Sequence, residues 1–485
     1  MTILEEYKGR LNNSDCEIIT ETHDVTVIDN TDVVVAGGGI AGITAALSAA
    51  RNGAKVILIE KEGYLGGYAT GGLVNFAGRY QDWYERVVGG LAEEILEQLK
   101  QDGAAIETEY DVCKEHPWLA KEQNWKDKYF SNTEGLKRTG VQFDTEKMKL
   151  LADNLLSKAK VKVLLHTFVT GAHQENGRLK YVILGSKSGH FAIGAKFFID
   201  CTGDGDLAAL AGANFEKGRP EDGKMLPVSL MFRLRGVNVK EAIEYQISDY
   251  GYANLIKELK QKGELNIPHS YILVRPTVYQ DGLEINGTRI TNIDGTNIFD
   301  LTKAEIELRS QTRMLEEMFK RYVPGCSKAY VSETASLIGV RETRRIIGEY
   351  VVQDKDLLDT FKFDDVVGRA TSHIDIHNPE GSGYDIRPIK AGDWYEIPYR
   401  SLVVKGLDNL FVAGRCISAS PVAQAALRLY LSVFVSGQAA GTGAALCIKE
   451  NVKARELNIR LLQKTLILQG VKLRDDIIEQ TGLSK

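Results

Sequence analysis

The sequence predicts an α/β fold: a Rossmann-like nucleotide-binding domain, with a parallel sheet and a β-meander crossover, interrupted by an inserted α+β domain. The sequence indicates a strand at residues 32–36, in which residues 33–36 are a continuous apolar run, as in a parallel strand buried on both faces. A glycine turn, an Ala-rich segment and a second apolar run at 55–59 follow, which is the beginning of a βαβ unit. A similar buried strand recurs at 409–413, so both ends of the chain are expected to build the sheet.

The elements of the first part are predicted in order. Residues 1–30 are polar and mixed and are interpreted as an N-terminal extension. A helix is expected over 40–51, where Gly53 stops it. Residues 63–80 are glycine-rich and irregular, and residues 91–160 are predicted to be largely helical, with a charged loop near 114–128. Strands are then expected at 161–165, 180–184 and 194–200.

The pattern also suggests domain boundaries. We expect residues 31–206 and 398–449 to form one discontinuous nucleotide-binding domain and residues 207–397 to form a substrate or cap domain. Within the latter, 304–321 is predicted to be helical, and 378–394, rich in Gly, Pro and Asp, is predicted to be a loop. Residues 450–485 are expected to be a helical tail.

Composition excludes several classes of partner and site. A net charge of −5 implies no basic face, so neither nucleic acid nor an anionic membrane surface is an expected partner. The six cysteines are scattered without a CxxC pair, which predicts no metal site and fits a reducing cytoplasm. No secretion signal is visible at the N-terminus. The uncharged stretch 429–448 is interpreted as a buried helix in preference to a membrane span, because it is rich in small and polar residues.

The strongest functional signal is Gly37-Gly38-Gly39-Ile40-Ala41-Gly42, which matches GxGxxG between a strand and a helix. Gly37 permits the tight turn, Gly39 allows a pyrophosphate to approach the backbone, and Gly42 allows close packing of helix and strand. The first N–H groups of the helix would point at the phosphates. Glu60, at the end of the second strand, is positioned to accept hydrogen bonds from a ribose. The alternative is a glycine turn without a ligand, and the motif alone does not separate FAD from NAD.

Further motifs resemble those of one large flavoprotein family. These motifs are Gly66–Thr70, Asp200–Asp206, Ile338–Arg345, Asp375–His377, Ile397–Arg400 and Asn409–Ser418. The chain resembles, from about residue 30 to 470, the bacterial FAD-dependent oxidoreductases, which are related to fumarate reductase and glutathione reductase. The resemblance implies a Rossmann-like FAD-binding domain, an inserted substrate domain and non-covalently bound FAD.

The resemblance also implies roles for individual residues. The 66–71 turn would line the pyrophosphate and the flavin edge, Val169 would hold the adenine, and Thr202 and Gly203 would close over the dinucleotide. Free N–H groups of Leu429 and Tyr430 would face the flavin N1/C2=O edge, where they favour the reduced flavin. The full set of expected cofactor contacts outside the GxGxxG motif is Glu60, Lys61, Gly66, Gly67, Tyr68, Ala69, Thr70, Gly71, Val169, Thr202, Gly203, Asp204, Gly414, Arg415, Leu429 and Tyr430. Arg415 stands where many relatives have an acidic residue, so the ribityl contact cannot be carried over.

Candidate proton handlers are His373, His377 and Tyr399, since a flavin leaves proton transfer to the protein. The alternative is that one histidine lies on the surface and the other is a structural hydrogen-bond donor. Arg428, at the start of an apolar helix, is expected to polarise the substrate or the flavin. Arg341, Arg344 and Arg345 would share a face if their segment is helical, and could hold a carboxylate. A solvated or ion-paired face is the interpretation favoured for this trio.

The sequence therefore predicts an FAD-dependent oxidoreductase that transfers hydride between a small polar organic substrate and FAD. No second complete fingerprint appears, so the electron acceptor or donor is expected to be external: a carrier, dioxygen or the substrate itself. The main alternative is an FAD-bearing electron-transfer component that acts with a redox partner protein. A flavin-binding structural protein and a lyase are weaker alternatives. The oligomeric state is left open, with a homo-oligomer allowed.

Overall fold

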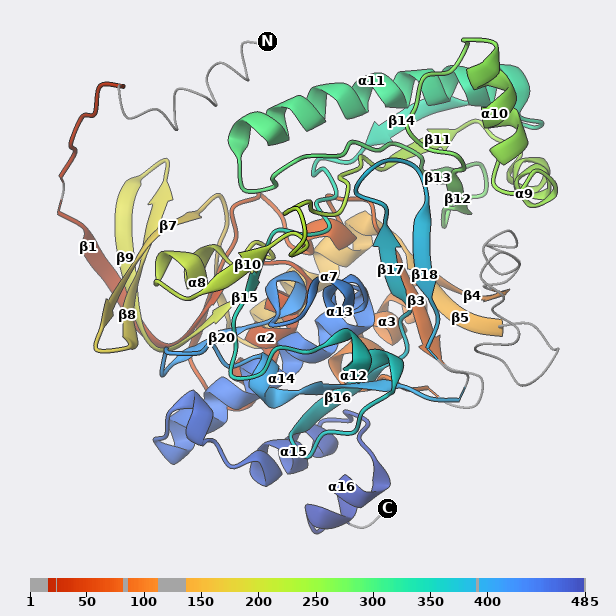
Figure 1. The fold of residues 1–485 in the computed structure, drawn as a ribbon. Helices are drawn as coiled ribbons and strands as arrows, with labels where there is room; N and C mark the ends of the chain where they lie inside the picture. The colour runs from red at the N-terminus through yellow and green to blue at the C-terminus, as the bar shows by residue number, and fades with distance from the viewer. Residues whose placement is uncertain (1–15, 23, 82–85, 112–136, 390–391, 484–485) are drawn as a thin grey trace.

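A computed structural model of the chain describes residues 16–22, 24–81, 86–111, 137–389 and 392–483. Its centre is a seven-stranded sheet (Figure 1). Five strands are parallel neighbours in the order β6 (Lys162–Leu164), β2 (Val56–Ile59), β1 (Thr26–Ala36), β9 (Gly189–Asp200) and β20 (Leu410–Val412). The predicted α/β fold is confirmed, and the last strand does come from the distant end of the chain. β1 begins at Thr26, so residues 26–30, assigned to the N-terminal extension, belong to the sheet.

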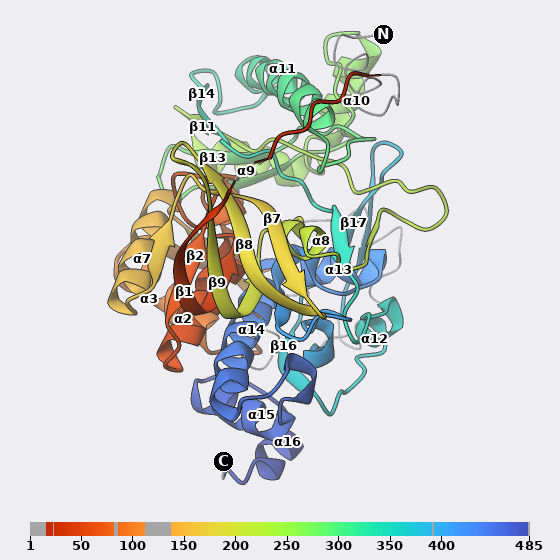
Figure 2. The ribbon, with the colours of Figure 1, turned by 90° about the vertical axis from the view of Figure 1, so that its left-hand side faces the viewer.

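An antiparallel meander covers one face of this sheet. β7 (Phe168–Glu175) pairs with β8 (Arg178–Ser186), and β8 pairs with β9. Alternate residues of β1, such as Val34 and Ala36, pack against Leu179, Val182 and Leu184, whereas Val33 and Val35 face the helices. Strands buried on both faces read as continuous apolar runs, which is why this part of the fold is visible in the sequence. Figure 2 shows the helices on one side of the sheet and the meander on the other.

Two helices form the core of the helical layer. α2 (Ile40–Arg51) spans the residues predicted from the sequence, and α14 (Tyr430–Glu450) packs along it. A Cβ built on Gly437 would lie 2.3 Å from the carbonyl oxygen of Ala41, and one on Gly441 would lie 2.1 Å from that of Ala45. α14 is long and apolar enough to cross a membrane, but 94% of its apolar window is buried inside the protein. It is therefore a core helix, as the sequence interpretation preferred.

The prediction that residues 91–160 are largely helical is wrong in part. Helices α3 (Leu91–Gln101) and α7 (Thr145–Lys158) are present, but β4 (Ala105–Asp111) and β5 (Lys137–Phe143) form a three-stranded antiparallel sheet with β3 (Phe76–Gln81). β3 comes from the segment expected to be irregular. The charged loop predicted near 114–128 lies outside the described residues.

The inserted segment builds the upper part of the molecule in Figure 1. A four-stranded sheet, in the order β12, β13, β11, β14, is flanked by α9, α10 and α11. The bounds are β11 (Phe232–Arg235), α9 (Val239–Ser248), α10 (Ala253–Gln261), β12 (Leu273–Pro276), β13 (Leu283–Asn286), α11 (Ile298–Tyr322) and β14 (Tyr330–Thr334). This sheet and its helices enclose their own apolar core, which confirms the predicted α+β character of the insertion.

Short elements join this part to the central sheet. The loop prediction for 378–394 is wrong in part, because this segment contains strand β18. Residues 344–346 form strand β15, so the condition of a helical segment, on which a shared face of Arg341, Arg344 and Arg345 depended, is not met. The elements are α8 (Asp206–Leu210), β10 (Phe215–Lys217), β15 (Arg344–Ile346), α12 (Asp354–Leu358), β16 (Val366–Ala370), β17 (Ile374–His377), β18 (Tyr384–Arg387), β19 (Tyr395–Pro398) and α13 (Pro421–Leu427). The 3-10 turns are η1 (Gly67–Ala69), η2 (Tyr399–Ser401), η3 (Gly414–Cys416) and η4 (Ala454–Glu456), and the tail ends with α15 (Ile459–Leu468) and α16 (Asp475–Gln480).

Candidate active site

In the glycine turn between β1 and α2, one of the glycines has empty space where a side chain would begin. Gly37 has φ +99°, and a Cβ there would lie 2.4 Å from the carbonyl oxygen of Cys201. A Cβ on Gly42 would lie 1.8 Å from the carbonyl oxygen of Gly37, whereas a Cβ on Gly39 would meet no heavy atom within 4 Å. Gly37 and Gly42 are therefore required by packing. Gly39 is not, and the space beside it at the start of α2 suits a phosphate group.

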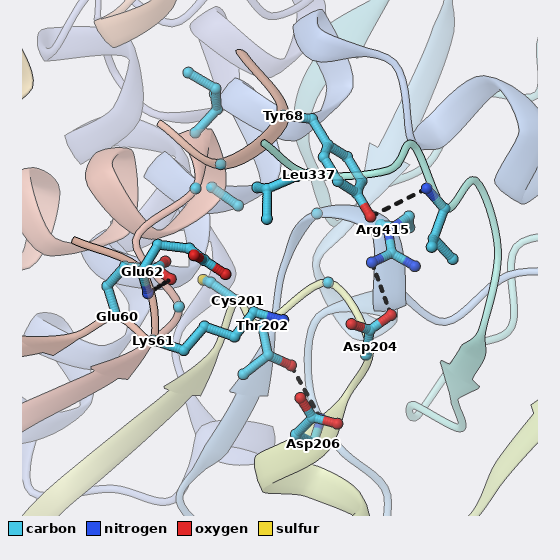
Figure 3. Close-up of a pocket in the computed structure, with 18 of the residues that line it drawn as sticks. Glu60, Lys61, Glu62, Tyr68, Cys201, Thr202, Asp204, Asp206, Leu337 and Arg415 are labelled. Carbon is cyan, nitrogen blue, oxygen red and sulfur yellow. Dashed lines mark hydrogen bonds and ion pairs between the residues drawn. The ribbon is translucent and has the colours of Figure 1, made fainter. Parts of the chain in front are cut away.

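This space is part of a first cavity of about 350 Å³ (Figure 3). The cavity runs from the meander, past the glycine turn, to the start of α14. Among the residues predicted from sequence to contact a cofactor, it is lined by Gly37, Gly39, Ile40, Ala41, Glu60, Lys61, Gly66, Gly67, Tyr68, Val169, Thr202, Gly203, Asp204, Gly414, Arg415 and Tyr430. The structure thus brings together most of the predicted set, although its members come from distant parts of the chain.

Glu60 stands at the end of β2 and faces the first cavity (Figure 3). Its Oε2 accepts a hydrogen bond from Gly38 N (2.6 Å), and its Oε1 accepts one from Glu62 N (2.9 Å). Burial raises the pKa of this carboxyl above its usual value. Each oxygen has a second lone pair, so the carboxyl can accept further hydrogen bonds from a ribose while it holds the glycine turn.

A second cavity, of about 270 Å³, adjoins the first. Five residues line both cavities: Tyr68, Val340, Arg415, Arg428 and Tyr430. The second cavity extends between the inserted sheet, at β12 and β13, and the β17–β18 hairpin. A ligand lying along the first cavity could therefore present one end to a molecule held in the second.

A family model described as "FAD dependent oxidoreductase" matches residues 32–466, most of the chain. The chain belongs to this family. FAD is therefore its cofactor, and the protein is an oxidoreductase.

Relatives with curated names match over short segments. Cinnamate reductase from Clostridium sporogenes is 42% identical over 83 residues, and fumarate reductase (cytochrome) from Shewanella frigidimarina is 63% identical over 41 residues. These matches cover 15% and 8% of this chain, and only 12% and 7% of the two relatives. They share a segment with this flavoprotein and not its whole length.

Solved structures resemble the chain over a longer span at low identity. A geranylgeranyl bacteriochlorophyll reductase-like protein from Thermoplasma acidophilum has a TM-score of 0.43 and 16% identity, and the alignment covers 93% of this chain and 96% of that one. p-Nitrophenol 4-monooxygenase from Pseudomonas putida has a TM-score of 0.43 and 14% identity, with 94% and 87% covered. The family assignment rests on the sequence match.

Several predicted cofactor residues of the flavoprotein support the cavity wall without lining it. The Thr70 hydroxyl donates to the carbonyl oxygen of Leu65 (2.7 Å), and the carbonyl oxygen of Gly71 accepts from Leu337 N (3.1 Å). Gly38, Gly42 and Ala69 are likewise absent from the lining. These residues hold the shape of the two glycine turns, so we reassign them from contact to support.

The expectation for Leu429 is wrong in one respect. Its N–H is not free, because it donates to the carbonyl oxygen of Ala426 (3.1 Å) and closes the last turn of α13. Leu429 is the N-cap of α14, and Tyr430 provides the first amide of the helix, which has no acceptor within the helix. The positive end of α14 nevertheless points to the region where the two cavities meet.

Arg415 and Asp204 form an ion pair across the first cavity. Arg415 Nη2 lies 2.7 Å from Asp204 Oδ1, and the guanidinium lies over the Tyr68 ring at 5.5 Å (Figure 3). The Thr343 hydroxyl also donates to Asp204 Oδ1 (2.8 Å). Because this carboxylate neutralises Arg415, the ion pair fixes the position of the 202–206 loop.

The two candidate histidines differ in whether their ring nitrogens have partners. His377 is buried, its Nδ1 lies 3.1 Å from Arg289 Nη2, and its Nε2 lies 3.4 Å from Asp375 Oδ2. Burial and the nearby Arg341 guanidinium lower the pKa of His377 to about 3. His373 lines the same cavity, and its buried Nδ1 has no hydrogen-bond partner among the described residues. Only His373 therefore offers an unengaged ring nitrogen there. His373 directly precedes strand β17, and His377 is its last residue.

Tyr399 is not placed to handle a proton. It lines neither cavity, and its hydroxyl donates to the carbonyl oxygen of Ala454 (2.8 Å) inside the core. Its ring lies 6.0 Å from that of Phe411. The structure therefore removes Tyr399 from the catalytic candidates and makes it a packing residue that ties η2 to the C-terminal tail.

Tyr399→Phe is expected to lower the free energy of unfolding by about 1 kcal/mol, since it deletes one buried hydrogen bond and keeps the ring. FAD content and the rate of flavin reduction should stay at the wild-type level. Chemical denaturation and stopped-flow absorbance would measure the two effects. A large fall in the reduction rate at unchanged stability would restore Tyr399 to the catalytic set.

The inserted domain supplies site residues that sequence reasoning missed. Arg275, Glu284 and Asn286 line the second cavity from β12 and β13. Arg233 donates to Glu284 Oε1 (2.9 Å), and Gln142 donates to Glu284 Oε2 (2.7 Å). Burial raises the pKa of Glu284 to about 7. No spacing in the sequence marks these positions, because the pairing of strands that aligns them is long-range.

Proposed function

We propose that this flavoenzyme transfers hydride between bound FAD and a small polar organic substrate held in the second cavity. The observation that carries the proposal is the common wall of the two cavities at Tyr68, Val340, Arg415, Arg428 and Tyr430. A dinucleotide lying along the first cavity has room for its flavin end there. A substrate in the second cavity would then contact the flavin directly, as hydride transfer requires.

The residues proposed to hold FAD follow from the geometry of the first cavity. The diphosphate would lie beside Gly39, where the backbone is open and the first amides of α2 are exposed to it. Glu60 would bind the adenosine ribose, and Val169 would lie near the adenine. The start of α14 at Tyr430 would face the flavin edge that becomes negative on reduction. Bound FAD supplies the hydride chemistry, and these side chains supply its position.

We propose His373 as the group that holds or releases the proton. Its support is an unengaged, buried Nδ1 in the cavity where substrate is proposed to bind. Arg428 also lines both cavities, and its buried Nε has no partner among the described residues. A buried donor or acceptor left without a partner costs about 1–3 kcal/mol, so a ligand that bonds to both groups would be stabilised. His377 would act through Asp375 and Arg428 and not by direct contact.

The remaining proposals concern the electron acceptor or donor and the cellular location of the protein. We propose an external electron acceptor or donor, since the sequence holds one complete dinucleotide fingerprint, at residues 37–42. The scattered cysteines favour the cytoplasm. Among the described residues no cluster of three metal-ligating side chains is found, so a second redox centre at such a site is not part of the proposal.

An anaerobic absorbance screen tests the proposed function. The purified holoenzyme would be mixed with sugars, amino acids and carboxylic acids, and the oxidised flavin band would be followed. Bleaching by one chemical class supports hydride transfer from that class. If no organic compound reduces or reoxidises the flavin, while a co-purifying redox protein does, the electron-transfer alternative replaces the proposal.

A further inference from the structure

Most of the arginines on and near the wall of the second cavity are paired with acids. Arg428 Nη2 lies 3.1 Å from Asp375 Oδ2, Arg415 is paired with Asp204, and Arg345 is paired with Glu342. Arg344 is paired with Asp206 at 2.8 Å. Of the three arginines at 341–345, two are therefore ion-paired, as the sequence interpretation favoured. The third, Arg341, differs from them.

Arg341 lines the second cavity without an acidic partner among the described residues. Its Nη1 donates to the carbonyl oxygen of Pro227 (2.6 Å), and no carboxylate lies within ion-pair distance of its guanidinium. Arg289 lines neither cavity and is buried, whereas Arg341 is half-buried; Arg289 donates to the carbonyl oxygens of Gly381 (2.6 Å) and Gly383 (3.3 Å) and to His377. Among the described residues, neither of these two guanidinium groups has a carboxylate within ion-pair distance. The Asp375 carboxylate on the same cavity wall influences both, but it is already paired with Arg428.

These charges persist at neutral pH. Burial and the neighbouring Arg428 lower the pKa of Arg341 to about 9, which still leaves the guanidinium protonated at pH 7. His377, with its pKa of about 3, is neutral and contributes no balancing charge. Removing a guanidinium from water without a counter-ion is costly. An anion in the cavity would recover that cost.

We infer that the substrate of this enzyme carries a carboxylate, and that Arg341, beside Arg428, binds it in the second cavity. The inference rests on the proposed function and specifies its substrate class. A guanidinium donates two parallel hydrogen bonds to a carboxylate, and the free Nε of Arg428 provides a further donor. Arg341 is thus assigned to substrate binding, whereas Arg344 and Arg345 serve the fold.

Ligand binding to the oxidised holoenzyme tests this inference without turnover. Succinate and benzoate would be titrated against their neutral counterparts succinamide and benzamide, at constant ionic strength. Binding would be followed by calorimetry and by perturbation of the flavin spectrum. We expect the carboxylates to bind and the amides to bind at least tenfold more weakly. Equal affinity for carboxylates and amides would overturn the inference, and this comparison needs no variant.

The variant Arg341→Gln tests whether this residue itself binds the carboxylate. A hydrogen bond to a charged group contributes about 1.5–3 kcal/mol, so the affinity for succinate is expected to fall roughly ten- to 100-fold with unchanged FAD content. Arg235→Gln is the matched control, because Arg235 is paired with Asp281 in the same inserted sheet and lines neither cavity. Unchanged succinate affinity in Arg341→Gln would refute the assignment.

The outcomes separate this inference from the proposed function. If neutral sugars bleach the flavin and the enzyme shows no preference for binding carboxylates, the proposed hydride transfer stands and the inferred carboxylate substrate is rejected. If carboxylates bind in a way that depends on Arg341, but no organic compound reduces the flavin, the carboxylate-binding site is supported and hydride transfer is rejected.

Discussion

Gly39→Val is expected to yield a folded protein that has lost its FAD. A Cβ at this position would meet no heavy atom within 4 Å, so we expect the fold to tolerate valine. The same side chain would fill the space beside the first amides of α2, where the diphosphate is proposed to lie. Because this contact anchors the whole dinucleotide, we expect flavin content to fall at least tenfold. The ratio of flavin absorbance to protein absorbance after purification measures the loss.

Gly42→Ala is the control that separates cofactor loss from misfolding. Its Cβ would lie 1.8 Å from the carbonyl oxygen of Gly37, so this variant should lose both structure and FAD. Gly39→Val should instead retain the wild-type far-ultraviolet circular dichroism spectrum. Normal FAD content in Gly39→Val would show that the diphosphate lies elsewhere.

His373→Gln is expected to slow flavin reduction by about 10²- to 10⁴-fold, the usual contribution of a general acid or base. Glutamine keeps hydrogen-bonding capacity but cannot carry the proton. FAD content should remain normal, because His373 lines the second cavity and not the first. Stopped-flow mixing with the substrate found in the screen would measure the rate.

Two other histidines serve as comparisons. His377→Gln should have a smaller effect, since both ring nitrogens of His377 already face partners, Arg289 and Asp375. His173→Gln, on the exposed face of β7 and outside both cavities, should change nothing. If flavin reduction were much slower in His377→Gln but near normal in His373→Gln, the proton-transfer role would belong to His377 instead of His373.

The nucleotide-binding part of the fold was predictable because its signals are local. A strand buried on both faces must be apolar throughout, and the turn that follows requires glycine at Gly37 and Gly42 for steric reasons. The helix at 40–51 and the strand at 56–59 then appear within one or two residues of their predicted bounds. The cofactor cavity follows, since the ends of parallel strands share one edge of the sheet.

The failures occur where distant pairing overrides local preference. Residues 105–111 were expected to be helical, yet they form a strand because β5 pairs with them along their length. Residues 344–346 pair with β10 in the same way, which separates Arg341 from Arg344 and Arg345. The second cavity could not be predicted at all, because β12, β13 and β17 meet there only after the inserted domain folds over the sheet. Sequence spacing therefore identified residues that gather around the first cavity, and it gave no indication of the second.

The contact between α2 and α14 has a consequence for biosynthesis. Gly437 and Gly441 of α14 lie against backbone carbonyls of the first helix, at Ala41 and Ala45, and leave no room for a side chain between the helices. α14 is synthesised several hundred residues after α2. The nascent chain therefore presents an unfinished flavin cradle until that late helix has left the ribosome.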